Sequence, residues 1–315
     1  MKSKKKVFLL FIIMTTLMVL YVTWGVNVNN YRYFLSGRIP RVIAIALTGG
    51  AIAFSSLMFQ TVTNNRILTP SVLGLDSLYI LIQTIVVFFM GSGSVFILNK
   101  NLNFTTTLIM MILFSCILFS LLLKQNKNLM KLLLVGIVIG TLFSSLSSFL
   151  QMIIDPNEFM HLQDKLFASF SRINTQILTL SIILAGITTL FIIKDFNVWD
   201  VLSLGRDVAI NLGVNYDKTI WKMLIAVSIL VSVSTALVGP ITFLGLMVVN
   251  LAREFLKTYK HKDLVIGSVL ISIISLVGGQ LIVERMLNFG TPISVIINFF
   301  GGMYFIYLLL KENIS

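Results

Sequence analysis

The residues that could do acid–base or metal chemistry are few in this sequence and widely spread. The 315-residue chain has 12 Asp and Glu residues and 2 His. None of these acids falls at the middle of a predicted membrane span, where a proton-driven carrier needs a carboxylate or histidine to bind and release its proton. His161 and His261 fall in predicted loops on opposite sides, so we expect no metal or catalytic role for either. The pattern argues against a proton symporter but leaves sodium coupling open.

Motifs for nucleotide binding or covalent catalysis are not found in the sequence. There is no GxxxxGK[ST] phosphate loop, so the chain is not expected to bind ATP in the Walker manner. No Ser/His/Asp or HExxH arrangement can be recognised. The single cysteine, Cys116, lies in an apolar run and cannot form a disulfide or a thiolate cluster within the chain. We therefore expect no enzyme activity and no metal or cofactor bound by this chain.

Uncharged polar residues do enter the apolar runs. Small hydroxyl side chains let helices approach closely and bond to one another, and we favour this packing role for most of them. The alternative is that they line a substrate path. The candidates for such a path are Ser144, Ser148 and Asn298.

Composition identifies the elements that must carry these residues. The chain is 57% hydrophobic and 11% charged, with a mean hydropathy of +0.96, whereas a soluble domain is about a quarter charged. This composition predicts an all-α, polytopic membrane protein with about ten transmembrane helices in a single transmembrane domain over residues 1–315. The net charge of +12 resides in short loops and termini, where it acts as a topology signal, so a nucleic-acid partner is not expected.

The apolar runs give the positions of the spans and their orientation in the lipid bilayer. We expect spans at about 7–25, 40–60, 70–90, 105–123, 130–153, 175–194, 218–238, 241–257, 264–283 and 292–310. With the N-terminus inside, most of the 24 Lys and Arg residues fall on the inner side. The positive-inside rule therefore predicts that both termini are cytoplasmic.

The longest polar interruption is the segment 197–216. Its apolar and polar residues alternate at helical spacing, which predicts an amphipathic helical element lying on the cytoplasmic surface. The apolar members are Val201, Leu204, Val208 and Leu212. We expect a partner protein to act on the membrane protein here.

The sharpest local signal is GPITFLGL at 239–246. The Gly239–Pro240 pair stands between two apolar runs and forces a break, which predicts a tight turn between two helices on the outer side. Phe243 and Gly245 complete the pattern. From the residues alone this is only a hairpin.

The sequence resembles, over nearly its whole length, the FecCD-type permeases of bacterial ABC importers for iron-siderophores, haem and cobalamin. GPITFLGL matches the GxIxFIGL turn of that family, and RIPR at 38–41 matches its RLPR. GGAIAFSSLMFQ at 49–60 stands in place of GAxLAxSGxxxQ. The family's NPLAxPxxLG element is matched at Asn65, Pro70 and Gly74. Its LGExxAxxLG element is matched at Leu204, Gly205, Ala209, Leu212 and Gly213.

The resemblance implies a type II ABC importer permease in the bacterial cytoplasmic membrane. Such a subunit pairs with a second permease, as a homodimer or heterodimer. Two cytoplasmic ATPases bind the ATP and Mg, and an extracytoplasmic binding protein delivers the substrate. Segment 197–216 would then hold the coupling helices that enter a groove of the ATPase. The residues expected at this contact are Leu204, Gly205, Arg206, Asp207, Ala209, Leu212 and Gly213.

Three arginines are expected on the side opposite the coupling segment. In the family, the corresponding residues pair with two glutamates on the lobes of the binding protein, and arginine suits such bidentate recognition of carboxylates. The resemblance therefore implies that Arg38, Arg41 and Arg285 dock the binding protein. Interfacial snorkelling is the alternative role.

Several positions depart from the family pattern. Arg206 stands where an acid is usual, Val249 and Asn250 replace its PH pair, and Arg66 replaces a proline. These changes suggest a divergent branch, with a heterodimeric partner that compensates. A ferric siderophore is the expected substrate, on family frequency. Haem and cobalamin are alternatives within the class, and a sodium-coupled carrier or channel is the alternative from a different class.

Overall fold

The protein is a bundle of helices. The computed structural model describes residues 2–25, 31–125, 129–171 and 173–312, and every regular element in these ranges is helical, which confirms the all-α fold class. The long helices are α1 (Lys2–Thr23), α2 (Tyr31–Thr63), α3 (Leu75–Met90), α5 (Lys100–Gln125), α6 (Leu129–Ile153), α8 (Thr175–Ile192), α11 (Tyr216–Val238), α12 (Leu244–Leu256), α13 (His261–Arg285) and α14 (Ile293–Glu312). Short helices connect them: η1 (Pro70–Leu73), α4 (Val95–Leu98), α7 (Pro156–Leu166), η2 (Ile193–Asp195), α9 (Phe196–Leu202) and α10 (Arg206–Asn211).

Eight helices of the described chain are long and apolar enough to cross a membrane: α1, α2, α5, α6, α8, α11, α13 and α14. The two other expected spans, 70–90 and 241–257, contain the shorter helices α3, with 16 residues, and α12, with 13 residues. At 1.5 Å per residue α12 is about 20 Å long, less than the roughly 30 Å of hydrocarbon in a bilayer. It therefore does not span a bilayer by itself.

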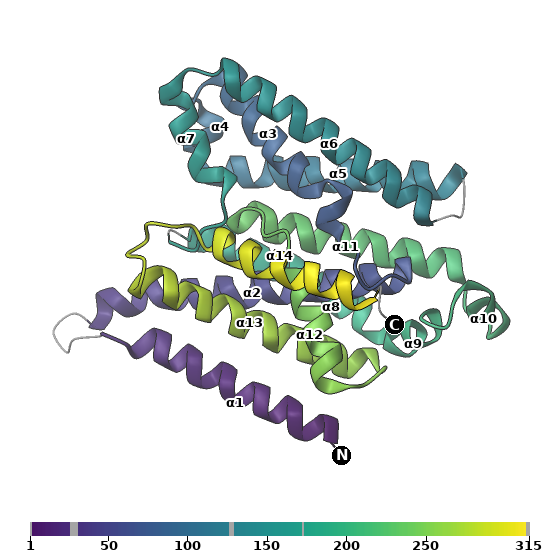
Figure 1. Ribbon diagram of the computed structural model, residues 1–315. Coiled ribbons are helices and arrows are strands. Elements are labelled where there is room, and N and C mark those ends of the chain that lie inside the picture. Colours follow the sequence, from purple (N-terminus) through teal and green to yellow (C-terminus); the bar gives the residue numbers. More distant parts are fainter. Residues whose placement is uncertain (1, 26–30, 126–128, 172, 313–315) are drawn as a thin grey trace.

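The helices α2 and α11 form the centre of the bundle. In each of them 67% of the most apolar stretch is buried, against 17% in α1 and in α6. α11 packs on α2, α5 and α8, while α13 packs on α1, α2 and α12. Figure 1 shows α3, α5, α6 and α7 as a group along one side of the bundle, which α11 contacts chiefly through α5.

The expected span 70–90 is broken at Gly74, whose φ is +83°. A Cβ at this position would lie 2.5 Å from the Cα of Gly140 in α6, so the two backbones meet without side chains between them. The break brings Asp76 into the interior, where it is 7% exposed and accepts a 3.0 Å hydrogen bond from the Thr242 hydroxyl. Asp76 lies in the first turn of α3 rather than at the middle of a span, and it is nevertheless a buried carboxylate, which the sequence pattern does not predict.

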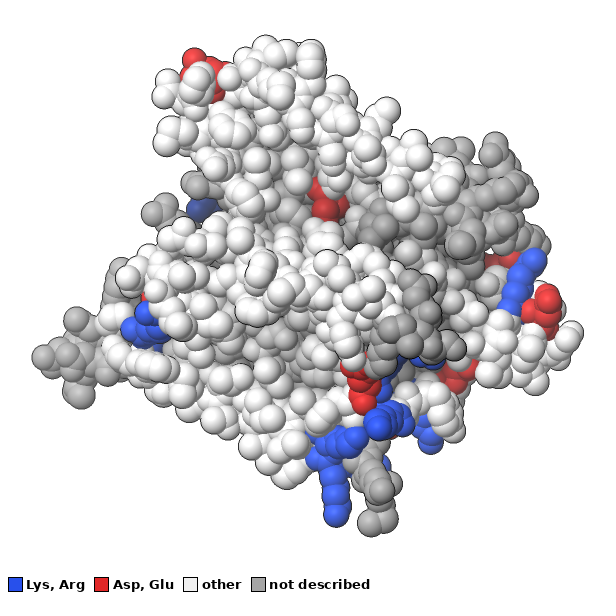
Figure 2. Space-filling view, viewed as in Figure 1, with Lys and Arg blue, Asp and Glu red and all other residues white. Residues whose placement is uncertain are grey.

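The two ends of the bundle differ in charge. The N-terminus, α9 and α10 lie at one end, called here the amino-terminal end, and α4, α7 and the connection between α13 and α14 lie at the opposite end (Figure 1). Most of the Lys and Arg side chains visible in Figure 2 gather at the amino-terminal end. This distribution agrees with the charge pattern from which we predict cytoplasmic termini.

Candidate functional site

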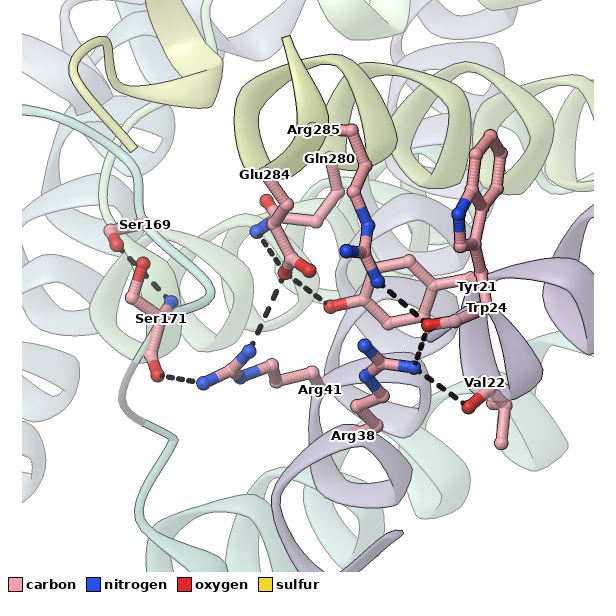
Figure 3. A network of polar contacts seen from close by, with 10 residues as sticks. All are labelled: Tyr21, Val22, Trp24, Arg38, Arg41, Ser169, Ser171, Gln280, Glu284 and Arg285. Carbon is pink, nitrogen blue, oxygen red and sulfur yellow. Dashed lines mark hydrogen bonds and ion pairs between the residues drawn. The ribbon is translucent and has the colours of Figure 1, made fainter. Parts of the chain in front are cut away.

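At the opposite end of the bundle, two of the predicted docking arginines bind the end of α1. Arg38 of α2 donates from Nη1 to the carbonyl oxygens of Val22 and Trp24, at 2.9 and 2.8 Å. Arg285, the last residue of α13, donates from Nη2 to the same Trp24 carbonyl at 2.7 Å and lies over the Trp24 ring. The last carbonyls of a helix lack partners within it and carry partial negative charge. The two arginines therefore cap α1 (Figure 3).

The third arginine, Arg41, belongs to an ion pair. Its Nη1 lies 3.4 Å from Oε1 of Glu284, and its Nη2 donates to the Ser171 carbonyl at 2.9 Å. The same Glu284 oxygen accepts hydrogen bonds from the Tyr21 hydroxyl and from the Gln280 amide (Figure 3). Glu284 is 8% exposed at its side chain, and Arg41 is 25% exposed. The carboxylate thus holds α1, α2 and α13 together.

The structure brings all three predicted docking residues into one network, around a depression of about 410 Å³. They are not equally accessible, since Arg38 is buried, Arg41 is half-buried and Arg285 is exposed. Sequence reasoning missed Glu284 and Tyr21, whose pairing across 263 residues has no local signal. These contacts are all within the chain, and docking stays a prediction.

The GPITFLGL turn is a buried junction. Gly239 has a φ of +100°, and a Cβ there would lie 3.0 Å from the backbone of residues 167–168. The amide of Phe243 donates to Asn298 of α14 at 3.3 Å, and the Thr242 hydroxyl donates to Asp76 of α3. The turn with Gly239, Pro240, Phe243 and Gly245 therefore connects α3 and α14, and Gly245 brings α12 against Ser56 of α2.

The residues predicted for a substrate path fall into two groups. Asn298 accepts the hydrogen bond from the turn, which supports a packing role for it. Ser144 and Ser148 are exposed on α6, and Ser144 donates to the Ser77 hydroxyl at 2.9 Å. Both serines lie on a helix whose most apolar stretch is mostly open. A path along this face of α6 stays a prediction.

The coupling segment at the amino-terminal end is two helices rather than one. Gly205, at φ +102°, separates α9 from α10, because a right-handed helix cannot continue through a positive φ. α9 is anchored, since Trp199 and Leu202 are 0% and 3% exposed. α10 projects, since Leu204 and Leu212 at its two ends are 61% and 60% exposed.

The polar residues of the segment divide in the same way. Arg206 is half-buried and its guanidinium lies over the ring of Tyr216, 5.6 Å from the centroid. Asp207 is exposed, while Ala209 is fully buried on the inner face of α10. Gly213 ends the segment at φ +82°. Arg206 therefore packs against the start of α11, and the negative charge at the surface of α10 comes from Asp207.

The structure corrects the expectation for His261. This residue begins α13 rather than lying in a loop, and it is 3% exposed. Its ring nitrogens lie 2.6 Å from Asp200 and 2.9 Å from the Thr61 hydroxyl, so a hydroxyl–histidine–carboxylate arrangement exists that the sequence did not reveal. The three residues are far apart in the chain, and only the packing of α2, α9 and α13 brings them together. His161 lies in α7.

Comparisons with known proteins agree on one family. Residues 6–311 match the FecCD transport family. The chain is 62% identical over 290 residues to the petrobactin import system permease protein YclO of Bacillus subtilis (strain 168), covering 92% of each chain. It is 33% identical to the petrobactin permease FatC of Bacillus anthracis, covering 99% of this chain and 92% of that one. A solved metal-chelate type ABC transporter in an inward-facing conformation has the same fold, with a TM-score of 0.85, 22% identity, and coverage of 98% and 99%.

Proposed function

Because the chain belongs to the FecCD transport family, we propose that it is the permease subunit of an ATP-driven importer that carries a ferric siderophore of the petrobactin type. The observation that carries this proposal is 62% identity to a petrobactin permease over 92% of both chains. The multi-pass helical bundle supports a route across the cytoplasmic membrane. The chain itself moves the substrate and hydrolyses no ATP.

The proposed ATPase contact is α10. Its exposed apolar side chains form a small patch at the amino-terminal end, and such patches with a polar rim mark protein interaction sites. The patch consists of Leu204, Val208, Ile210 and Leu212. A groove on one of the two cytoplasmic ATPases would cover it, and the two ATPases would bind the ATP and Mg. This assignment makes both termini cytoplasmic.

The proposed contact with the extracytoplasmic binding protein is the depression at the opposite end. Arg41 and Arg285 are its accessible cations. The buried Arg38 caps the end of α1 beside them. Charged rims of this kind chiefly set the orientation and rate of docking. Carboxylates on the two lobes of the binding protein would be the matching groups.

The proposed second permease, an identical or related chain, covers α6 and α14. The most apolar stretches of these helices are only 17% and 22% buried, and their outward side chains are large and apolar. Lipid covers such surfaces as well. We place the substrate path between the two permeases, because Ser144 and Ser148 lie on α6.

The direct test is iron uptake in a bacterial host that lacks its own petrobactin permease. Expression of the chain with its partner subunits should restore uptake of radiolabelled ferric petrobactin, and an inactive ATPase should abolish it. Restored uptake of haem or cobalamin instead would assign the alternative substrates, as some relatives at about a quarter identity are vitamin B12 permeases. Uptake that needs sodium but no ATPase would assign a carrier.

A further inference from the structure

The contact between α9 and α13 is made by Asp200 and His261, which are not among the residues expected to contact the ATPase. Oδ1 of Asp200, on α9, accepts a hydrogen bond from the backbone amide of His261 at 2.9 Å and lies 2.6 Å from Nδ1 of its ring. On the far side of the ring, Nε2 lies 2.9 Å from the hydroxyl of Thr61 in α2. One carboxylate oxygen of the coupling segment therefore reaches two membrane-spanning helices through one imidazole.

Asp200 also replaces a missing helix cap. The N-cap position of α13 is Lys260, whose side chain caps no backbone amide. A carboxylate at a helix N-terminus accepts hydrogen bonds from amides that have no partner within the helix, and the helix dipole favours its negative charge. α13 thus takes its capping carboxylate from α9, so the two helices cannot separate without exposing that terminus.

Apolar packing reinforces the same contact. The Trp199 ring is fully buried and meets the His261 ring edge-on, with centroids 6.1 Å apart. On its other sides Trp199 packs against Phe196 of its own helix and Phe54 of α2, at 5.0 and 5.6 Å. Edge-on aromatic pairs of this kind add to the free energy gained by burial. α9 is therefore fixed to α2 and α13 by side chains on two adjoining positions.

The hydrogen-bond inventory of His261 is complete when the ring is neutral. An ionised carboxylate can only accept, so Nδ1 carries the hydrogen that faces Asp200. Nε2 is then an acceptor, and the Thr61 hydroxyl donates to it. When the ring is protonated, Nε2 donates to Thr61, whose hydroxyl hydrogen then points to the Leu57 carbonyl at 2.9 Å. No heavy atom has to move between the two states.

The other end of the coupling segment, α10, is joined to α9 by a hydrogen-bonded turn. Three residues join α9 to α10, and their amides continue the hydrogen bonding of α9. Leu204 and Gly205 donate to Val201 and Leu202, both at 3.1 Å. A displacement of α10 therefore reaches α9 through a bonded turn.

We infer that Asp200, His261 and Thr61 form a latch that transmits displacement of α10 to α13 and α2. This inference rests on the proposed function, because the displacement comes from the ATPase bound to α10. The three are positioning residues, since they act through α9 on the membrane-spanning helices. The latch holds α9 rigidly against the membrane-spanning helices while α10 is pushed.

The test uses the assembled importer in proteoliposomes, with ATP hydrolysis and siderophore uptake measured in the same vesicles. In Asp200→Ala we expect uptake per ATP hydrolysed to fall about tenfold, because a coupling contact is lost while the ATPase patch is intact. Asp200→Asn should keep the ratio within about twofold, because its amide oxygen accepts both hydrogen bonds. Lys262→Gln, a change at an exposed residue of the same helical turn, is the matched control and should leave the ratio unchanged.

A second measurement covers the case in which Asp200→Ala fails to fold. Spin labels at Ser203→Cys and Lys262→Cys, in a Cys116→Ala background, report the distance between α9 and α13 in an otherwise unaltered latch. The latch predicts the same distance without nucleotide and with ATP. A shift of more than about 3 Å between these states would overturn it, since a hydrogen bond does not survive such a separation.

The outcomes separate this inference from the proposed function. Normal uptake per ATP in Asp200→Ala, or equal defects in Asp200→Ala and Asp200→Asn, would overturn the latch while the importer stands. If the unaltered chain recruits no ATPase, the proposed function fails, and with it the role of the latch in transmission. A lowered ratio in Asp200→Ala, rescued in Asp200→Asn, supports both.

Discussion

The two ends of the bundle differ in whether their side chains have partners within the chain. At the opposite end, Arg38 and Arg41 have donors bonded to α1 carbonyls, to Glu284 and to the Ser171 carbonyl. At the amino-terminal end, α10 exposes Leu204 and Leu212 by about three-fifths of their surface. The comparison teaches that the arginines at the opposite end have partners within the chain, so a protein that binds there adjusts an existing network. The exposed leucines beside α10 are not covered within the described chain, so they would gain burial from a partner protein.

The largest expected effect comes from placing charge in the apolar patch. Leu212→Asp would bury an unpaired carboxylate beneath the ATPase, which costs several kcal/mol. We expect ATPase affinity to fall by at least about a hundredfold, as measured by co-purification of the ATPase with the permease. Uptake should fall with it.

The control for Leu212→Asp is Leu98→Asp, since Leu98 in α4 is a leucine of similar exposure, 70%, at the opposite end. It should leave ATPase binding unchanged. Equal binding by Leu212→Asp and the unaltered chain would show that α10 is not the apolar contact.

The next effect concerns the arginines at the opposite end and is a loss of stability. Arg38→Ala removes a buried side chain that is the donor to the Val22 carbonyl and one of two donors to the Trp24 carbonyl, and we expect the free energy of unfolding to fall by about 1–3 kcal/mol. Arg285→Ala removes an exposed side chain from the same carbonyl and should cost less than about 1 kcal/mol. Thermal unfolding of the purified protein measures both. If the two variants melt alike, the internal network does not stabilise α1 as described.

Docking is tested with variants that keep a hydrogen-bond donor. Arg41→Gln combined with Arg285→Gln removes both accessible cations from the depression while each amide can still donate. We expect affinity for the binding protein to fall about tenfold, mainly through slower association at low salt. Surface plasmon resonance at two salt concentrations measures this change. An unaltered association rate would leave these arginines with a structural role only.

The last effect is a pH dependence and concerns Lys165 of α7, at the opposite end. Burial lowers the pKa of Lys165 from 10.5 to about 8, and its Nζ donates to Gln83 at 3.2 Å. Between pH 8 and 10.5 the unfolded chain therefore binds more protons than the folded one, so this residue makes stability rise with pH. Lys165→Met should remove that rise from the unfolding midpoint, and Lys100→Met, a change at an exposed lysine, should keep it. A rise that persists in Lys165→Met would have another source.

The sequence predicted the helices well because their apolar runs are long. Eight of the ten expected spans are long and apolar helices, with ends within about five residues of those expected except in α2, which begins at Tyr31 rather than near residue 40. The exceptions are the spans with internal breaks. Pro70 and Gly74 divide one of them, and the turn after Gly239 shortens the other. A hydropathy window averages over such breaks, and only the backbone geometry reveals them.

The sites were predictable only where a local pattern exists. The exposed stripe of α10 follows from helical spacing, and the grouping of the arginines follows from the family resemblance. The ion pair of Glu284 with Arg41 and the hydrogen bond of His261 with Thr61 each join residues about 200 or more positions apart. Each depends on which helices are neighbours, and one sequence carries no signal for that. The burial of Asp76 was not predictable for a related reason, since it depends on the break at Gly74.

The contact of Gly74 with Gly140 has a consequence for how the molecule can open. At this point η1 and α6 meet backbone to backbone, and Leu73 lies against Gly136 one turn away on α6. Surfaces fitted this closely resist sliding, because any offset drives main-chain atoms into one another. The η1–α3 unit and α6 should therefore travel as one rigid body. A hinge motion that opens a path for the substrate must therefore occur at a different helix–helix interface of the bundle.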